Sequence, residues 1–505
     1  MLAIERAFDR AFGARANPWR NLGALGFLFF WVLAATGIYL FIRFDTSVGG
    51  AYRSIEHLTR EEWWLGGFLR SVHRYATDGF VAVSLLHLIK EWADGHFRHY
   101  RSFSWVSGVP LAWLLFGAGL IGYWLVWDAR AHFSALATAE WFDSLGIFSE
   151  PVARNFVSAQ SVNDRLFSLF VFLHLGLPLA LLAGMWVHVK RLGYPRNLPP
   201  ASLSLGTLAM LAAAAALFPA RSHGQADPAR LPSAIDLDWL LMFAHPLQYA
   251  TSPRFVWLLA GGATLVLTAL PWLSRRAAPI AARMSLENCN GCGRCVADCP
   301  FAAVTLVPAA NRTGSQAQVF ADLCAACGIC AGACPSSTPF RTASTIVSGI
   351  DVPEFTVNDL RQRLENALSR LAGAIRVVVF GCDCAVRVTA LADRATAAIS
   401  LPCTGMLPPS FVEYALRNGA DGVLVTGCRE GECAYRLGTE LTVARMARER
   451  EPHLRASVPQ ERLRFAWLGR SEEEDCAAAL ANFREALAAA AERQARPTKR
   501  MIAHA

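Results

Sequence analysis

Long apolar runs fill the first 273 residues, and they constrain the fold more than any other feature. Six of them occur, at residues 22–42, 76–94, 108–127, 166–190, 203–219 and 254–273. Most are near or above the ~20 apolar residues that a helix needs to cross the hydrocarbon core of a bilayer. Inside that core each backbone polar group must be bonded within the protein, which an α-helix achieves by itself. The front half is therefore predicted to be an all-α transmembrane bundle with six spans.

The composition changes near residue 274. Fourteen of the 15 Trp precede Ser274, whereas 13 of the 14 Cys lie between Cys289 and Cys433. The first part suits a bilayer and the second suits water. The predicted divisions are a membrane domain at 1–274, a cysteine-rich domain at 280–340, a linker at 341–373, a small domain at 374–470, and a C-terminal helix and tail at 471–505.

The basic residues fit membrane orientation better than binding to a polyanion. The formal net charge is +8, but Lys and Arg do not form a stripe with interleaved aromatic residues, so no nucleic-acid partner is expected. Many of them lie before residue 22, at 90–101, at 190–196 and at 275–283. These segments share one side if six spans alternate, and the positive-inside rule assigns that side to the cytoplasm. We expect a multi-pass protein of the bacterial inner membrane with both termini in the cytoplasm.

Four histidines occur at matched spacing in two of the predicted spans. His73 and His87 are 14 residues apart on the second span, and His174 and His188 are 14 residues apart on the fourth. This separation is close to four helical turns, so each pair lies on one helix face, about 21 Å apart along the axis. Both helices run in the same direction in this topology. His73 is therefore predicted to meet His174 at the outer depth, and His87 to meet His188 at the inner depth.

These pairs predict two b-type haems. Imidazole is an axial ligand of haem iron, and an ionisable group within a span has a functional role by default. The alternative is that the histidines only form hydrogen bonds between helices, but the matched spacing on two helices favours haem. Two further histidines, His132 and His245, are candidates to border a quinone site on the outer side.

Several motifs lie around these spans, over roughly residues 16–273: NPWRNLG at 17–23, TG at 36–37, LRSVH at 69–73, WVSG at 105–108, GYWLVW at 122–127 and HLGLP at 174–178. They resemble the cytochrome b family of quinol–cytochrome c oxidoreductases and its chloroplast relatives. That resemblance implies a helical bundle that binds haem and reacts with quinone. Its small residues would let flat macrocycles approach the helix backbones, and Arg70 can neutralise a haem propionate. The candidate glycines are Gly23, Gly37, Gly108 and Gly122.

The outer quinone site departs from that family. Where the family carries Pro-Glu-Trp-Tyr, the nearest match is Leu237-Asp238-Trp239-Leu240. Asp238 is the candidate to accept a quinol proton. The chain has two spans after the fourth instead of the longer family set, and it shows no Rieske-type Cys/His pattern. A bifurcating cycle of the bc type is therefore not expected.

Eight cysteines form two copies of the pattern C-x₂-C-x₂-C-x₃-C-P, which is typical of bacterial two-cluster ferredoxins. In that arrangement the fourth Cys of each copy ligates the other cluster. The first [4Fe–4S] cluster would be bound by Cys289, Cys292, Cys295 and Cys334. The second would be bound by Cys324, Cys327, Cys330 and Cys299. Zinc or disulfides are the alternative, but zinc motifs generally lack the third Cys, and a cytoplasmic face disfavours disulfides.

From residue 374 onward, strand-like and helix-like stretches alternate, which predicts a small α/β domain with a parallel sheet. Cysteines follow the predicted strands, and ligands gather at the carboxyl ends of parallel strands. We therefore expect a metal site there, formed from Cys382, Cys384, Cys403, Cys428 and Cys433. Cys476, on the last helix, is predicted to be structural.

Within this domain, the motifs LPCTGM at 401–406, GADGV at 419–423 and GCREGECAYR at 427–436 resemble the delta subunit of methyl-viologen-reducing hydrogenase, over roughly residues 374–450. The resemblance implies one [2Fe–2S] cluster and coupling to flavoproteins of the heterodisulfide reductase type. The first cysteine pair here is C-x-C instead of the family's C-x-x-C, and Ala434 stands where a His is usual. The expected ligands are Cys403, Cys428, Cys433 and one of Cys382 or Cys384.

Together these features predict a multidomain chain, with an all-α transmembrane haem-binding bundle, an α+β ferredoxin-like domain and a small α/β domain. We expect an electron-transfer subunit of a quinone-dependent oxidoreductase, working between a cytoplasmic flavoprotein and the quinone pool. Substrate chemistry would belong to a partner, because the chain carries no flavin or nucleotide motif. The alternative is a membrane-anchored redox sensor or anchor without quinone turnover. The direction of electron flow and assembly as a homodimer are left open.

Overall fold

The structure is a computed structural model that describes residues 2–13, 15–158, 161–190, 197–230, 234–273, 279–310, 312–429, 432–470 and 472–495. It divides into two compact units, one formed by Met1–Lys190 and Pro195–Arg275, the other by Arg191–Tyr194 and Arg276–Ala505. The predicted basic segments at 190–196 and 275–283 fall partly outside the described residues. Each unit is described by itself.

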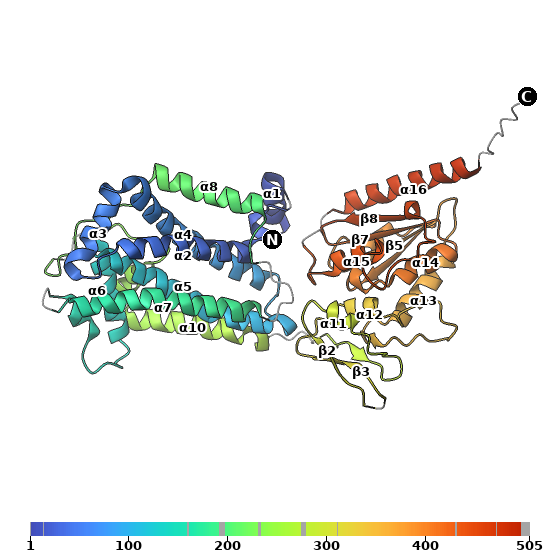
Figure 1. Ribbon diagram of the computed structural model, residues 1–505, viewed down its shortest axis with the longest axis horizontal. Helices are drawn as coiled ribbons and strands as arrows, with labels where there is room; N and C mark the ends of the chain where they lie inside the picture. Colours follow the sequence, from blue (N-terminus) through green and yellow to red (C-terminus); the bar gives the residue numbers. More distant parts are fainter. Residues whose placement is uncertain are drawn as a thin grey trace, which may run out of the picture. The chain divides into compact units, whose positions relative to one another are not determined.

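The first unit is built from long helices that lie alongside one another (Figure 1). Within it α2 packs against α4, and α5 packs against α7 and α10. Large apolar side chains such as Phe29, Phe80 and Leu181 fill the space between them. The long helices are α2 (Leu22–Arg43), α4 (Phe68–Ala93), α5 (Ser102–Val126), α7 (Asp164–Val189) and α10 (Pro253–Leu273).

Shorter helices complete this unit. Helix α6 begins after Asp128, whose side chain accepts a hydrogen bond from the backbone N–H of Ala131 and so caps the helix. It packs near Phe156 and Phe167 in a second apolar cluster. The shorter helices are α1 (Leu2–Phe12), α3 (Val48–Arg60), α6 (Ala129–Asp143), α8 (Ala201–Leu217) and α9 (Ala244–Ala250).

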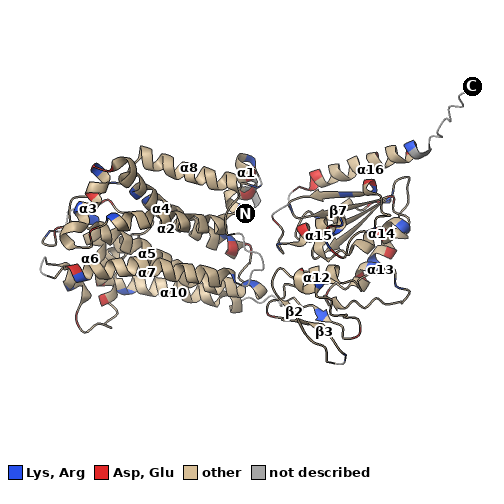
Figure 2. Ribbon diagram, in the orientation of Figure 1, with Lys and Arg blue, Asp and Glu red and all other residues tan. Residues whose placement is uncertain are grey.

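The long helices of this unit are those of a membrane protein. Among the described residues, four are long and apolar enough to cross a bilayer: Leu22–Arg43, His99–Val126, Asp164–Val189 and Pro253–Leu273. Figure 2 shows α5, α7 and α10 free of charge along their middle, with charged residues near the helix ends. Two of the six predicted spans fall outside this set, since α4 contains several charged residues and α8 has only 17 residues. A total of six spans stays a prediction.

The second unit begins with a small α+β part. Strands β2 (Val304–Pro308) and β3 (Ser315–Val319) form an antiparallel hairpin, and β1 (Arg283–Met284) pairs with β4 (Ile350–Asp351). Two short helices, α11 (Arg294–Ala297) and α12 (Ile329–Ala333), each follow a glycine with positive φ, Gly293 at 77° and Gly328 at 76°. Such a conformation favours glycine, and it produces the tight turns between the cysteines.

Residues 341–373, expected to be a linker, instead carry regular structure. They contain β4 and helix α13 (Val357–Leu368), which has a capping box formed by Thr356 and Asp359. Leu360 and Leu364 of α13 are fully buried in the core of the domain that follows. Because these side chains pack into a core, the segment joins its neighbours firmly instead of separating them.

A parallel sheet forms the rest of the unit, with strand order β6-β5-β7-β8. Side chains alternate along β5, so Val378 and Phe380 face the core with α13, whereas Val377 and Val379 face α16. Cys476 is buried in that second core. The elements are β5 (Val377–Cys382), β6 (Thr396–Leu401), α14 (Pro409–Arg417), β7 (Gly422–Gly427), α15 (Gly438–Met446), β8 (Leu463–Trp467) and α16 (Glu473–Ala495). The helical bundle followed by α+β and α/β parts confirms the predicted fold class.

Candidate cofactor sites

The helices α4 and α7 bring the four histidines together in two pairs. The ring centroids of His73 and His174 are 6.4 Å apart. Two imidazoles with metal–nitrogen bonds of about 2 Å each leave their ring centres separated by roughly this distance. His188 lies within electrostatic range of His87. These are the two pairs that the 14-residue spacing predicts, and they require α4 and α7 to run in the same direction.

Three of the four imidazoles are held through Nδ1 by groups on other helices. Such contacts fix the ring and its tautomer, and they leave Nε2 available to bind a metal. The sequence analysis did not assign these partners, although Thr36 lies in the TG motif at 36–37 and Ser107 lies in the WVSG motif at 105–108. The contacts are His73 Nδ1 with Thr36 Oγ1 at 2.9 Å, His174 Nδ1 with the carbonyl oxygen of Ala118 at 3.0 Å, and His188 Nδ1 with Ser107 Oγ at 3.1 Å.

The four predicted glycines each lie against a different histidine. Two come from α2 and face α4, and two come from α5 and face α7. A Cβ atom at Gly37, Gly108 or Gly122 would press on an imidazole, and one at Gly23 would reach ordinary van der Waals contact, so the glycines form a cradle that suits a planar group bound at the same place. A Cβ atom on Gly23, Gly37, Gly108 or Gly122 would lie 3.5, 3.2, 3.1 or 2.9 Å from Cε1 of His87, His73, His188 or His174, respectively.

Arg70, the candidate partner of a haem propionate, is buried among other partners. Its Nη1 atom donates to Thr59 Oγ1, and Nη2 donates to Ser222 Oγ at 2.8 Å. The carboxylate of Glu56 is 3.8 Å from Nη1. Arg70 is thus held in place from α3 and from the loop after α8, and its role toward a propionate stays a prediction.

Asp238 lies between α4 and α5 and accepts hydrogen bonds from Arg74 and Tyr123. It also accepts from the backbone N–H groups of Leu240 and Leu241, at 2.8 and 3.2 Å. Burial by itself raises the pKa of Asp238, but the bond from Tyr123 and the charge of Arg74 outweigh it, and the net pKa is lowered. A carboxylate stabilised in this way is a weak base, which disfavours proton acceptance. The role of Asp238 as a proton acceptor stays a prediction.

His132 and His245 are both buried, in α6 and α9. His132 Nε2 is 2.6 Å from the carbonyl oxygen of Phe156, which gives this imidazole a structural partner. His245 Nε2 lies 3.2 Å from Ser134 Oγ, whereas its Nδ1 atom has no hydrogen-bond partner among the described residues. Burial lowers the pKa of His245 to about 4, so the ring is neutral near pH 7.

In the second unit, the first predicted set of four thiols lines one cavity. Cys289, Cys292, Cys295 and the distant Cys334 surround it, together with Leu306, Ala317 and Ile350. The Ser336 hydroxyl is 3.0 Å from Cys334 Sγ. Burial raises the pKa of Cys295 to about 12. Such a thiol ionises when a cation binds it, so metal binding at this site would release protons.

The second set, Cys299, Cys324, Cys327 and Cys330, lies beside the first. Each of the first three is within electrostatic range of Cys330, and so is Cys295 of the first set. Backbone N–H groups of Ala282 and Ala326 donate to Cys324 Sγ, both at 3.4 Å, and Ala303 N–H donates to Cys299 Sγ at 3.3 Å.

The five remaining predicted cysteines meet at the carboxyl ends of β5, β6 and β7. Hydrogen bonds with Cys384 and Cys403 raise the pKa of Cys382, and bonds with Cys403 and Cys428 lower the pKa of Cys433 to about 2. Cys382 therefore contacts several thiols, whereas Cys384 is partly exposed and hydrogen-bonds to Cys382. This five-thiol group is brought together as the sequence predicts.

A glycine also borders the five-thiol group. A Cβ atom on Gly438, the first residue of α15, would lie 2.1 Å from Cys403 Sγ and 3.1 Å from Cys433 Sγ. A side chain at position 438 would occupy the space of the sulfur atoms. The sequence alone gave no reason to select this glycine.

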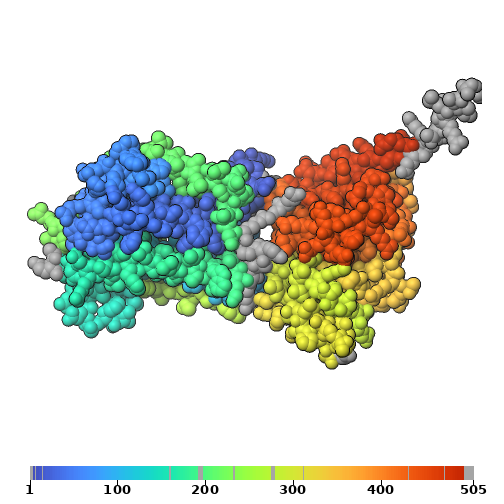
Figure 3. Space-filling view, viewed as in Figure 1, coloured from blue at the N-terminus to red at the C-terminus, as the bar shows by residue number. Residues whose placement is uncertain are grey.

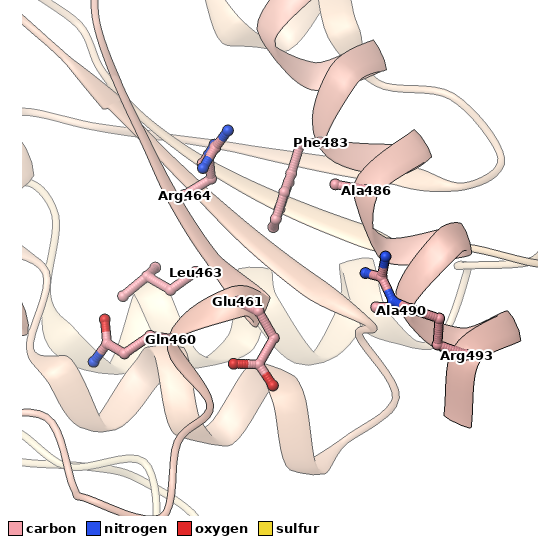
Figure 4. Close-up of a pocket in the computed structure, with 8 residues that line it drawn as sticks. All are labelled: Gln460, Glu461, Leu463, Arg464, Phe483, Ala486, Ala490 and Arg493. Carbon is pink, nitrogen blue, oxygen red and sulfur yellow. The ribbon is translucent and has the colours of Figure 1, made fainter. Parts of the chain in front are cut away.

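A separate cavity of about 490 Å³ lies between β8 and the C-terminal half of α16 (Figure 4). It is lined by Leu463, Arg464, Phe483, Ala486 and Arg493, among others. It contains neither a histidine nor a cysteine, so it is not one of the predicted cofactor sites.

The fold and these sites define the class of the protein: it is a membrane electron-transfer protein with a haem-binding helical region and a tail of iron–sulfur domains. Three families match successive parts of the chain. Residues 9–194 match cytochrome b/b6/petB, residues 288–338 match the 4Fe-4S dicluster domain, and residues 377–490 match the delta subunit of methyl-viologen-reducing hydrogenase. These matches confirm both resemblances seen in the sequence, and the order of the three parts.

One solved structure similar to this chain is described as a hyperthermophilic respiratory Complex III. The two chains are 19% identical, with a TM-score of 0.42, and the similarity covers 50% of this chain and 75% of the other.

Proposed function

We propose that this chain is the quinone-reactive subunit of an oxidoreductase complex, and that it passes electrons between a cytoplasmic flavoprotein and the quinone pool. The observation that carries the proposal is the arrangement of four imidazoles in two pairs, each imidazole facing a glycine of a neighbouring helix. Two low-spin b haems would be held there, by His73 with His174 and by His87 with His188. Haem supplies one-electron chemistry within the bilayer, where protein side chains alone cannot.

The thiol groups extend the proposal to the second unit. Two [4Fe–4S] clusters would be bound by the two sets of four cysteines, and one [2Fe–2S] cluster by four cysteines of the five-thiol group. Of the two open candidates, Cys382 is the better ligand, because it contacts three other members of the group, Cys384, Cys403 and Cys428. The delta-subunit match supports a flavoprotein partner of the heterodisulfide reductase type.

A quinone site on the outer side is favoured by His245. Its Nδ1 atom is a buried hydrogen-bonding group without a protein partner among the described residues, which is costly unless a ligand or water satisfies it. The buried side chain of Gln248, one turn further along α9, also has an unpaired oxygen. A protonated His245 Nδ1 would donate to a quinone carbonyl, and a quinol hydroxyl would donate to Gln248 Oε1.

The proposed location is the bacterial inner membrane, with both termini in the cytoplasm.

The test is a redox titration of membranes that contain this subunit alone. We expect two low-spin haem b signals, and cluster signals by electron paramagnetic resonance (EPR). Addition of a reduced quinone analogue should reduce at least one haem, and His245→Leu should slow that reduction without lowering haem content. Lack of the haem signals, or of the cluster signals, contradicts the proposal.

The second candidate function is a membrane-anchored redox sensor or anchor. The observation that favours a sensor is the exposure of two thiols, Cys292 and Cys384, because clusters near a surface are accessible to oxidants. A sensor need not exchange electrons with quinone. Haem reduction that does not respond to quinone, in a preparation with all clusters present, would support the sensor over the oxidoreductase subunit.

A further inference from the structure

Arg445 of α15 is fully buried at the contact between the two iron–sulfur parts of the second unit. Its Nη1 atom donates to the carbonyl oxygen of Gly405 at 2.7 Å. Its Nη2 atom donates to Asp298 at 2.5 Å and to the carbonyl oxygen of Ile329 at 3.3 Å. Gly405 belongs to the sheet domain, whereas Asp298 and Ile329 belong to the ferredoxin-like part. One guanidinium group therefore joins the two.

The charges around Arg445 are unbalanced. Asp298, which lies between the ligand candidates Cys295 and Cys299, is 2% exposed, and its second oxygen accepts from Arg450 Nε at 2.7 Å. Two guanidinium groups thus share one buried carboxylate. Water reaches Arg450, which is 39% exposed, but not Arg445, whose buried charge is opposed by a carboxylate that it shares. Cys403 is within electrostatic range of Arg445, and a cluster bound by thiolates would supply negative charge there.

The two parts approach each other backbone to backbone around this arginine. A Cβ atom on Gly332 would lie 2.2 Å from the carbonyl oxygen of Gly405, and one on Gly405 would lie 2.8 Å from Ile329 Cγ1. A Cβ atom on Gly328 would lie 2.6 Å from Met406 Sδ. No larger side chain fits at these positions. Figure 3 shows the ferredoxin-like part, in yellow, packed against the orange and red sheet domain.

This contact brings the second set of thiols to the five-thiol group. Cys327 shares one apolar cluster with Cys403, Ile329 and Leu441, and Cys433 packs against the same cluster. The cavity of the first set, in contrast, is lined by residues between Cys289 and Ile350 alone. The second set is therefore the neighbour of both other sites.

We propose that Arg445 is a positioning residue that fixes the short contact between the second four-thiol set and the five-thiol group, and that its buried charge raises the reduction potentials of the clusters on both sides. The inference rests on the proposed function, because it takes both sites to hold iron–sulfur clusters. A fixed positive charge stabilises the added electron, and hence the reduced form. Exchange of one electron between the two sites oxidises one and reduces the other, and it needs no further reactant.

The experiment uses the full-length protein with its cofactors. Arg445→Gln removes the charge, so the potentials of the [2Fe–2S] cluster and of the neighbouring [4Fe–4S] cluster should fall, and their magnetic coupling in EPR spectra should weaken. The more distant [4Fe–4S] cluster should keep its potential. Arg445→Lys restores the charge without the planar fork and should recover most of the shift but not the coupling. The control is Arg464→Gln, the same change at an exposed position on β8, which should alter neither.

Unchanged potentials and coupling in an Arg445→Gln protein that contains all its clusters would overturn the proposal. If that protein does not fold, Arg450→Gln provides the second test, because it removes the partly exposed guanidinium from the same carboxylate. It should lower the same two potentials by a smaller amount, and unchanged potentials there would also overturn the proposal. Absence of cluster signals from the unaltered protein is a different result, since it contradicts the proposed function itself.

Discussion

The four histidines of the first unit stand on two long helices, whereas the thirteen clustered cysteines of the second stand on loops and at strand ends. In the helical unit, glycines and hydrogen-bond partners come from neighbouring helices, so each imidazole depends on residues far away in sequence. In the ferredoxin-like part, turns at Gly293 and Gly328 and nearby backbone N–H groups hold the thiols. Ligand geometry is set by helix packing in the first unit and largely by local backbone conformation in the ferredoxin-like part of the second.

This difference has a consequence for mutation. A rigid helix cannot move one residue without moving its neighbours, so a single added methyl group can displace an imidazole. A loop can adjust, so a thiol site should tolerate changes around the ligands, except at tightly packed glycines such as Gly328 and Gly438, but not loss of a ligand.

Loss of a histidine ligand should have the largest effect. His174→Ala removes one axial ligand of the outer site, so we expect one haem to be lost and the α-band of the dithionite-reduced protein to fall by about half. The inner pair, His87 and His188, should keep its haem. The measurement is haem content and reduced-minus-oxidised absorbance. The control is His57→Ala, at a half-exposed position outside the pairs, which should change neither. A full α-band in His174→Ala would favour plain hydrogen bonding between helices.

The next largest effect should come from adding one methyl group beside a histidine of the helical unit. Gly122→Ala places a Cβ atom 2.9 Å from His174 Cε1, so the outer haem should bind about 10- to 100-fold more weakly, as it does when ligand orientation is disturbed. Haem titration of the apoprotein measures this change. Gly176→Ala is the matched control, because a Cβ atom there would meet nothing within 4 Å. Equal haem affinity in the two variants would contradict the claim that helix packing fixes the position of each imidazole.

The same residues show which parts of the sites a sequence pattern can predict. The 14-residue spacing predicted which histidines pair, because helical periodicity extends along a whole span. The cysteine pattern predicted two sets, and the structure places Cys334 in the first cavity, far from its own repeat. The α/β alternation predicted where five cysteines would meet. In each case a regular pattern determined the geometry.

Contacts without such a pattern could not be predicted. The carbonyl oxygen of Ala118 that holds His174 carries no side-chain signal. Asp298 and Arg445 are 147 residues apart, and neither belongs to a periodic motif. Asp238 was predicted as a candidate quinol proton acceptor from its place in a motif, and its partners Arg74 and Tyr123 come from packing that the motif does not specify. Such pairings depend on how separate elements pack, which residue type and spacing do not specify.

A smaller effect should separate the two cysteines that the sequence left open. Cys382→Ser removes the thiol that contacts Cys384, Cys403 and Cys428, so we expect loss of the [2Fe–2S] signal. Cys384→Ser should keep that signal, because Cys384 lies at the partly exposed edge of the group. Iron content and EPR spectra of the two variants provide the measurement, and haem absorbance should stay constant in both. The reverse outcome would make Cys384 the ligand.

The smallest effect should come from the groups behind the histidines. Thr36 donates its hydroxyl to the carbonyl oxygen of Val32, so it accepts at Oγ1 the proton of His73 Nδ1. That bond makes the imidazole a stronger donor to iron, and its loss in Thr36→Val should raise the potential of the outer haem without removing haem. Ser107→Ala should raise only the inner potential, since Ser107 contacts His188. A potentiometric titration of both variants distinguishes the two haems. Equal shifts in the potentials of both haems in either variant would contradict this prediction. Such shifts would mean that each hydroxyl acts through the whole bundle instead of through one imidazole.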